Sequence, residues 1–454
     1  MIKPKLPACI IAAIILTLAG CATVRKDAGF PALKTEVAGR TGHRVHWNLG
    51  TPEDRDVAEA VTALLARDLI AEEAVQIALL NNRRLQAVYE DLGVAQAELV
   101  QAGLLRNPIF TGSIRFISDG DVWNIELSIA QEFINIFMIP LRKKLAEKNE
   151  DAARVRVAAV VLDMALAVKT AFYRLQGAQQ ELEVLRLSLH AAEASFEMAE
   201  RLHQAGNITD LQLSRKQASH AQALLEDQAM ESRVLEHREQ LNLLMGLWGA
   251  DTEWKYVHRL PELPDRDPDL KQMETKAVTA SLELELARRE MEISAQRLGL
   301  ARATSVLPHL EAGVKGEREE GQWSLGPSLA LPLPLFDQGM PARAAAEGEL
   351  KKRWENYFAL AVEVRSEARN ARNRLVLARQ RVEYQEKVMV PLYRRITQET
   401  QLMYNAMQVG VFDLLEAKRE ELEMERRSVQ ELKNYWIARA ELEQLLSGRS
   451  AATH

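Results

Sequence analysis

Few residues of this chain have the types and spacing that catalysis or metal binding requires. His43 and His46 lie three positions apart, which could place two ligands on a metal, but no further ligand stands near them. We therefore interpret them as polar surface residues. The sequence also lacks a glycine-rich phosphate loop, a nucleophile elbow and a cluster of histidines or cysteines. It predicts no enzyme, no cofactor and no metal site.

Cys21 is the residue whose context indicates covalent chemistry. Two lysines near the start are followed by an apolar run over 8–18, too short to be a comfortable membrane span, and then by Leu18-Ala19-Gly20-Cys21. This order resembles a bacterial lipobox, in which the cysteine is diacylated, with palmitate as an expected chain, and becomes the mature N-terminus. An ordinary cleaved signal peptide with a chance cysteine is the alternative.

The lipobox has consequences for the first part of the chain. Residues 1–20 would be a signal peptide, and Ala22, rather than aspartate, after the cysteine implies sorting to the outer membrane. Several acyl chains together anchor a protein stably. Because residues 21–68 are rich in glycine, proline and charge, we expect a lipidated tether there, with one short helix near 57–65.

A tandem duplication organises the rest of the chain. Apolar residues recur every seven positions in two rows, the a/d seam of helices packed knobs-into-holes. The rows are Leu175, Leu182, Leu189 and Phe196 with Ala178, Leu185, Ala192 and Ala199. Adding 200 gives Leu375, Val382, Met389 and Ile396 with Ala378, Gln385, Leu392 and Glu399, so only Gln385 and Glu399 break the apolar rule.

Each half of the duplication contains a predicted β-hairpin. Trp123, Ile125, Leu127 and Ile129 alternate with Asn124, Glu126, Ser128 and Ala130, the period of a strand with one apolar and one polar face. A poorer strand precedes this one, and 119–120 is Asp-Gly, a turn signal. In the second half, we expect Pro327 at a bulge or in an edge strand, since proline lacks a ladder donor.

Long helices complete each half, over 141–204 and 342–408, and shorter ones return over 210–247 and 413–446. Tight turns separate them, at Ala205-Gly206-Asn207 and Val409-Gly410-Val411. The fold class is mainly α with a small β part. The predicted boundaries are a first repeat at 69–250 (hairpin about 109–133), a linker at 251–268, a second repeat at 269–447 (hairpin about 309–335) and a tail at 448–454.

An open sheet of four strands with one apolar face is not stable in lipid, because its edges leave backbone groups unpaired. The smallest closed membrane barrel has about eight strands, so the chain would have to share a barrel with further copies. Packing of the hairpins on a soluble body is the alternative. The net charge of −6 offers no basic surface for nucleic acid, and the mean hydropathy of −0.21 excludes a bundle of membrane helices.

The ordered set of features resembles the TolC-like outer membrane efflux proteins. Local matches lie at 73–82, 307–310 and 332–339, and at Tyr404 with 413–417. The lipobox and these local matches indicate the branch of the family that serves pumps of the resistance-nodulation-division type. The resemblance implies a homotrimer with a twelve-stranded β-barrel in the outer membrane, lipid-facing at Trp123, Ile125, Leu127 and Ile129, continued by an α-helical coiled-coil barrel in the periplasm.

The resemblance also implies partners and site residues. The helical turns, with Gly206, Asn207, Val409 and Gly410, would face a periplasmic adaptor and an inner-membrane pump. Pore-constricting acids of the family lie just after the second tip, which matches Asp413 and Glu416. These two could instead be a helix N-cap and its capping-box partner. One departure concerns the second tip, where Met407 occupies the position at which the family usually has glycine.

The expected function is a duct that passively exports metal ions or drugs delivered by the adaptor and pump. The alternative is a periplasmic coiled-coil adaptor or scaffold lipoprotein without a pore. An adaptor has one helical hairpin between small β-domains, whereas this chain has two full repeats with their β-hairpins opposite the tips. No residue of the sequence identifies the exported substrate.

Overall fold

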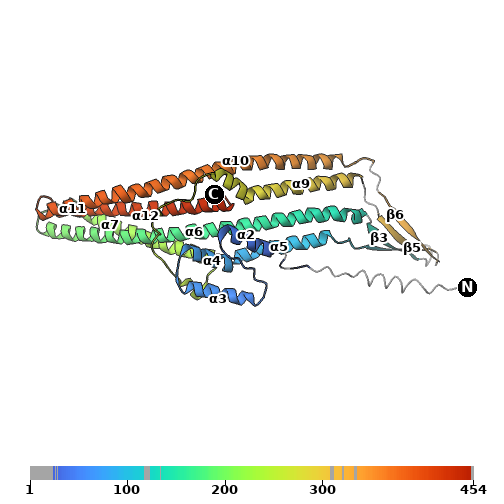
Figure 1. The fold of residues 1–454 in the computed structure, drawn as a ribbon. Coiled ribbons are helices and arrows are strands. Elements are labelled where there is room, and N and C mark those ends of the chain that lie inside the picture. The colour runs from blue at the N-terminus through green and yellow to red at the C-terminus, as the bar shows by residue number, and fades with distance from the viewer. Residues whose placement is uncertain are drawn as a thin grey trace. The chain divides into compact units, whose positions relative to one another are not determined.

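The computed structural model describes residues 24–25, 27, 29–116, 123–132, 134–306, 311–319, 322–331 and 335–450. Cys21 and the expected turn at 119–120 lie outside these residues. The chain is mainly helical with a small sheet, as its sequence predicts (Figure 1). It divides into two compact units. Unit 1 comprises Met1–Pro31, Glu90–Arg154 and Ala287–Glu355, and unit 2 comprises Ala32–Tyr89, Val155–Leu286 and Asn356–His454.

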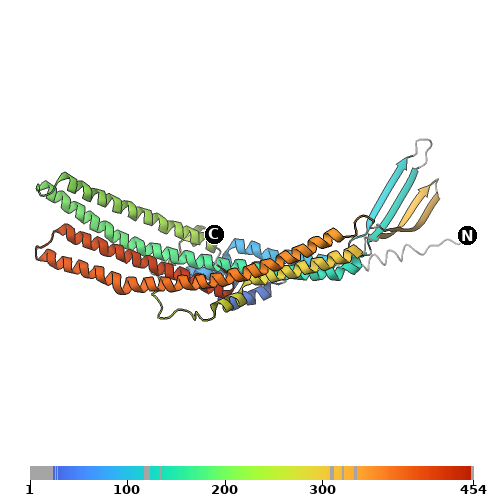
Figure 2. The same ribbon diagram turned by 90° about the horizontal axis from the view of Figure 1, so that it is seen from above.

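Unit 1 contains one antiparallel sheet, in the strand order β2-β3-β5-β6 (Figure 2). Pairing of β5 with β6 runs from Glu311↔Ala330 to Glu319↔Gln322 in unbroken register. Pro327 therefore lies in an edge strand rather than at a bulge, and edge strands are where sheets tolerate proline. The strands are β2 (Ile109–Phe116), β3 (Trp123–Glu132), β5 (Glu311–Glu319) and β6 (Gln322–Ala330).

The sheet has two chemically different faces. Directly paired residues share a face, so the register gathers most of the apolar side chains of the four strands on one side. They are Phe110, Ile114, Ile125, Leu127, Ile129, Val314, Leu325, Pro327 and Leu329. Arg318 lies on this face as well, opposite Ile125, and Ile109 lies on the other face, opposite Ala130. The opposite face carries Ser113, Arg115, Asn124, Glu126, Ser128, Lys315 and Glu317. The side chain of Trp123 falls outside the described residues.

The two hairpins are joined at β3 and β5. On the polar face, Lys315 Nζ of β5 lies 2.9 Å from Glu126 Oε1 of β3. Gly313 faces Ala130 across this ladder, and a Cβ on it would lie 2.2 Å from the carbonyl oxygen of Ile129. Only glycine therefore allows the two strands to approach as closely as they do here.

The helix leading into each hairpin is broken once, at matching places. The first repeat has α4 (Ala71–Asn81) and α5 (Arg83–Ala102), and the second repeat has α8 (Met273–Ala280) and α9 (Leu282–Val306). Asn82 and Ser281 adopt extended ψ values of 120° and 119° at the breaks. Their side-chain oxygens accept backbone N–H groups of the following helix, which starts it anew.

The long helices follow the hairpins. In the first repeat, α6 (Ile134–Gln204) starts seven residues before the predicted 141 and α7 (Asp210–Met245) returns. In the second, the expected single helix is divided into α10 (Met340–Tyr384), a π-helical turn (Gln385–Met389) and α11 (Val390–Asn405), and α12 (Val411–Ser447) returns. A 3₁₀ turn (Gly249–Thr252) and the short strand β4 (Lys255–Tyr256) begin the connection between the repeats.

The π-helical turn shifts the seam by one residue. Before it the buried residues keep the offset of 200: Ala371, Leu375, Ala378 and Val382 match Ala171, Leu175, Ala178 and Leu182. After it the more buried positions are Val390, Tyr393, Thr397 and Thr400, whereas Leu392, Ile396 and Glu399 are exposed. The prediction that the seam continues through these last three residues is wrong. Pro391 explains the turn. It has no N–H to donate to the carbonyl one helical turn earlier, and its ring would clash with that carbonyl in a regular α-helix.

The region expected to be a tether is folded in unit 2 from residue 32 on. Helices α2 (Phe30–Thr41) and α3 (Glu53–Leu65) flank an extended segment at 43–49, here called the N-terminal strap. Val45 and Trp47 of the strap are buried. Strand β1 (Asp68–Leu69) then pairs with β4. The sequence predicts only the helix near 57–65, because the glycine, proline and charge of the whole region 21–68 indicated a tether.

Two glutamines hold the strap by its backbone. Gln76 Oε1 accepts from Arg44 N (3.0 Å) and its Nε2 donates to Arg44 O (2.9 Å). Gln86 likewise accepts from Asn48 N (2.8 Å) and donates to His46 O (2.9 Å). Each amide thus replaces a neighbouring strand, which satisfies the strap's polar groups.

Candidate functional site: the hairpin tips

The first tip, between α6 and α7, closes with a glycine. Gly206 adopts a φ of +73°, its N–H donates to His203 O, and Asn207 N donates to Leu202 O. This is the Schellman arrangement, in which a left-handed residue satisfies the last carbonyls of a helix. Thr209 then caps α7, since its hydroxyl accepts from Gln212 N while Gln212 Oε1 accepts from Thr209 N.

The second tip, between α11 and α12, has the same hydrogen bonds without a glycine. Met407 N donates to Tyr404 O and Gln408 N to Met403 O, both at 2.9 Å. Met407 has a φ of +58° and its side chain is 94% exposed. A left-handed conformation costs a side-chain-bearing residue about 1–2 kcal/mol. The departure from glycine therefore leaves the turn type unchanged and adds strain to it.

Asp413 stabilises the start of α12. Its Oδ2 accepts a hydrogen bond from Gly410 N at 2.9 Å, while Gly410 is the N-cap and has a φ of −81°. Asp413 is thus the acidic partner of the cap rather than the N-cap itself. Its carboxylate is exposed, so capping leaves its charge open to solvent. Val409 and Gly410 lie in this same turn, after Met407 rather than at its left-handed position.

Glu416 is paired within its own helix and takes no part in the cap. The Arg419 guanidinium binds its carboxylate at Oε1 and Oε2. This hydrogen bonding holds the pKa of Glu416 below its usual range, with a smaller contribution from Lys216 of α7. The carboxylate therefore stays charged, although Arg419 neutralises much of its field.

Glu416 and Arg419 also line a groove between α12 and the pair α6 and α7. The groove has a volume of about 470 Å³, and Glu423 and Arg426 continue its charged wall. Small residues of α6 and α7, including Ala192 and Ala218, form the other side. Near its tip end, Lys216 Nζ of α7 lies 4.6 Å from the centre of the Phe412 ring, which links the two helical hairpins.

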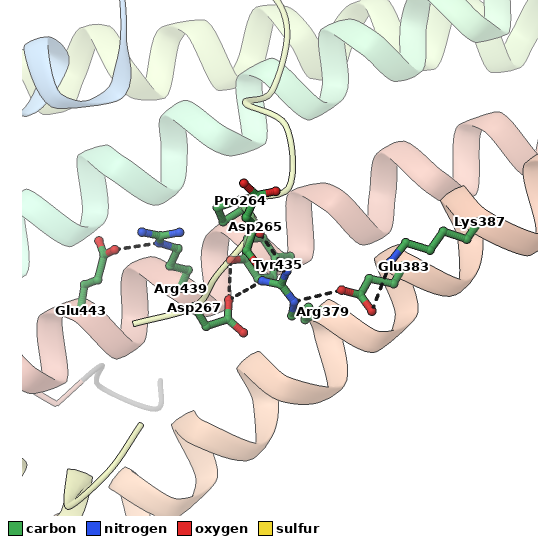
Figure 3. A network of polar contacts seen from close by, with 9 residues as sticks. All are labelled: Pro264, Asp265, Asp267, Arg379, Glu383, Lys387, Tyr435, Arg439 and Glu443. Carbon is green, nitrogen blue, oxygen red and sulfur yellow. Dashed lines mark hydrogen bonds and ion pairs between the residues drawn. The ribbon is translucent and has the colours of Figure 1, made fainter. Parts of the chain in front are cut away.

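A polar network ties the connection between the repeats to the second one (Figure 3). Arg379 of α10 donates to Asp267 Oδ1 (3.0 Å) and to Pro264 O (2.8 Å), and Tyr435 of α12 donates to the same Asp267 oxygen (2.7 Å). One carboxylate therefore joins two helices. Sequence reasoning treated 251–268 only as a linker, because its partners lie more than a hundred positions away.

The two early histidines do not form a pair. His43 Nε2 lies 3.1 Å from Glu72 Oε2, and His46 Nε2 lies 2.6 Å from Asp54 Oδ1. The hydrogen bond from His43 lowers the pKa of Glu72 to about 2. Lys169 contributes to this shift, since its Nζ lies 2.6 Å from Glu72 Oε1. Across the described part of the chain, no three histidine, cysteine, aspartate or glutamate side chains gather to hold a metal ion.

None of the helices in the described ranges contains an apolar stretch long enough to cross a bilayer.

Comparisons with known proteins give one consistent result. The model of the outer membrane efflux protein family matches residues 74–247. The cobalt-zinc-cadmium resistance protein CzcC of Cupriavidus metallidurans is 23% identical over 364 residues, which is 78% of this chain and 84% of CzcC. This match extends well beyond the family model.

Solved structures share the fold. The Campylobacter jejuni CmeC outer membrane channel superposes with a TM-score of 0.70 at 16% identity, covering 84% of this chain and 86% of CmeC. The outer membrane protein VceC of Vibrio cholerae gives 0.67 at 16%, covering 84% and 96%. The duplicated helix–hairpin–helix order and the paired tips described above agree with these matches, so the chain is similar to the outer membrane efflux proteins in sequence over residues 74–247 and shares the fold of their solved channels.

Proposed function

We propose that this protein is the outer membrane channel of a tripartite efflux system and passively conducts what an inner-membrane pump and a periplasmic adaptor deliver. The observation that carries this proposal is the sheet of unit 1. It has an apolar face, a polar face, and outer strands β2 and β6 that pair with no further strand among the described residues. Such a sheet suits lipid on one side and water on the other once its edges are closed.

Three copies of four strands would close a twelve-stranded barrel, within the range of outer-membrane barrels. The helical hairpins would continue it as a coiled-coil barrel in the periplasm, with the tips toward the adaptor. The expected localisation is the outer membrane, with a lipid anchor at Cys21. The resemblance of the tips to one another supports a quasi-equivalent role for both in the adaptor contact.

The exported substrate we propose is a divalent metal ion, because CzcC is a cobalt-zinc-cadmium resistance protein. Deleting the gene should then lower resistance to those ions, and restoring it should recover the resistance. If resistance to metals stays unchanged while sensitivity to a drug rises, the substrate assignment fails and the channel proposal survives. A monomer that forms no conducting pore in a planar bilayer would favour the scaffold alternative instead.

The faces of the sheet give a matched pair of variants. Ile125→Arg should impair trimer assembly in the membrane, since arginine on a lipid-facing position costs about 2–4 kcal/mol at the midplane and less toward the interfaces. Asn124→Arg, one residue away on the polar face, should be tolerated. The measurement is the yield of a heat-resistant trimer on a mild-detergent gel. Equal yields of trimer from both variants would show that the sheet does not lie in the membrane.

Asp413 and Glu416 are proposed to form acidic rings at the narrow end of the duct. Rings of carboxylates concentrate cations, so Asp413→Asn and Glu416→Gln should reduce cation selectivity and block by multivalent ions in single-channel recordings. Asp413→Asn should have the larger effect, because Arg419 already compensates Glu416. If thermal stability falls and selectivity does not change, Asp413 acts only as a cap and the constriction lies elsewhere.

Cys21 is proposed to be the acylated N-terminus of the mature protein. Mass spectrometry of the purified protein should find residues 1–20 removed and acyl chains on the cysteine. Cys21→Ser should abolish lipidation while the strands still insert, because the barrel would hold itself in the membrane. A mature N-terminus elsewhere, or an unmodified cysteine, would contradict the assignment.

A further inference from the structure

Large apolar side chains are exposed where the strands of unit 1 meet its helices. Phe137 near the start of α6 is 73% exposed, and Leu335 and Phe336 after β6 are 71% and 101% exposed. Met340, which begins α10, is 72% exposed. We name these four residues the rim cluster. A fully exposed phenylalanine adds no burial to the fold, so its partner is not in this part of the chain.

The rim cluster belongs to one end of the sheet. Glu132, at the end of β3, pairs with Glu311 at the start of β5, which pairs with Ala330 at the end of β6. Phe137 follows Glu132 by five residues, and Leu335 follows Ala330 by the same number. The exposed Leu329 of the apolar face and Leu331 lead directly into the cluster, so its surface continues that face.

Basic residues follow the apolar ones along α6. Lys143 and Lys144 are exposed, and neither has an ion pair within the described residues. At 1.5 Å per residue they lie about 10 Å beyond Phe137 along the helix. This is roughly the depth to which interfacial apolar groups enter a bilayer. Apolar side chains followed at this distance by lysines are typical of a segment at the boundary between acyl chains and lipid phosphates.

We propose that the rim cluster is a phospholipid-binding collar. Its apolar side chains enter the acyl-chain boundary of the periplasmic leaflet, and Lys143 and Lys144 contact the phosphate groups. This inference rests on the proposed position of the sheet in the membrane. A lipid surface fits better than a second copy of the chain, because a buried protein contact would leave two unpaired lysines beside it.

The test measures how deeply a nitroxide at Phe336 lies in a lipid vesicle. Phe336→Cys is labelled in the full-length trimer, with Cys21 acylated or replaced by serine, and reconstituted into phosphatidylethanolamine–phosphatidylglycerol vesicles. Collision rates with oxygen and with a water-soluble nickel complex give the depth. Leu325→Cys on the apolar face and Met407→Cys at the tip are the reference labels. We expect the Phe336 label between the deep Leu325 label and the aqueous Met407 label.

A second measurement tests the lysines. Lys143→Glu with Lys144→Glu should shift the Phe336 label toward water, whereas Lys351→Glu with Lys352→Glu, another lysine pair of unit 1, should leave its depth unchanged. A Phe336 label that collides with neither oxygen nor the nickel complex would mean that protein covers the cluster. A Phe336 label that collides with the nickel complex as often as the Met407 label would mean that the cluster is exposed to water. Either result overturns the collar. A wet Leu325 label would instead refute the membrane position itself.

Discussion

Gly313→Val should prevent the two hairpins of the chain from pairing and should abolish the assembled trimer. The added Cβ would meet the carbonyl oxygen of Ile129 at 2.2 Å and the Cα of Ala130 at 2.9 Å. Both are backbone atoms, so the strands would have to separate rather than repack a side chain. We expect a loss of about 3 kcal/mol or more per chain. The yield of folded trimer after refolding into detergent measures it.

Gly326→Val is the matched control. Gly326 lies on the same polar face, opposite Lys315, but no atom comes within 4 Å of the position of its Cβ. Valine also has a higher strand propensity than glycine, so this variant should assemble at least as well as the unmodified protein. If both valine variants assembled equally, the close approach of β3 and β5 at Gly313 would be disproved.

Glu181→Ala should destabilise the packing of α6 against α12. The Glu181 side chain is 4% exposed, and its oxygens accept from Lys433 Nζ and from Gln430 Nε2, each at 2.8 Å. Removing it leaves the half-buried Lys433 ammonium, whose side chain is 23% exposed, without this partner. The loss in fully buried pairs is about 3–5 kcal/mol, which is an upper limit here. The midpoint of denaturant unfolding, followed by the helical circular dichroism signal, measures the loss.

The double variant Glu181→Leu with Lys433→Met separates the ion pair from packing. It removes both charges and keeps apolar volume, so most of the lost stability should return. Gly177 shows how closely the lysine fits, because a Cβ there would lie 2.5 Å from Lys433 Cδ. A double variant no more stable than Glu181→Ala would mean that the pair itself, and not an isolated lysine, determines the loss.

Much of the fold follows from local patterns in the sequence. The two faces of the sheet could be predicted because polar and apolar residues alternate along the sequence, as Asn124 and Ile125 do. The heptad seam likewise predicts the long helices. Capping at Thr209 was recognisable from its position after the turn, where a side-chain oxygen is needed.

The missed features depend on residues that are far apart. The N-terminal strap shows only Val45 and Trp47 in alternation, and nothing in the sequence connects it with Gln76 and Gln86. Glu181 looked like an ordinary charged position, because its partner Lys433 lies 252 positions away. Similarly, the capping alternative for Asp413 and Glu416 lies three residues too late, since the left-handed residue at Met407 makes Gly410 the N-cap and Asp413 its partner.

The π-helical turn was hidden because both possible registers begin with apolar residues. Met389 and Leu392 would continue the old seam as well as Val390 and Tyr393 form the new one. Ile396 against Thr397 then favours the old register and Glu399 against Thr400 the new one, so the sequence gives no clear signal for the shift. The three-dimensional structure separates them through burial alone.

The inserted residue also limits how the two halves can be exchanged in engineered proteins. In a regular α-helix one extra residue would turn everything after it by about 100° around the axis, whereas the π-helical turn absorbs the residue and keeps the buried face on one side. A graft that replaces the second tip by the first can join them after Met389, where residue numbers differ by 201, as Gly206 and Met407 do. A graft joined before Gln385 must instead use the offset of 200, because it removes the π-helical turn together with the extra residue. With the offset of 201 at that place, the extra residue would enter a regular helix and point the whole tip in the wrong direction.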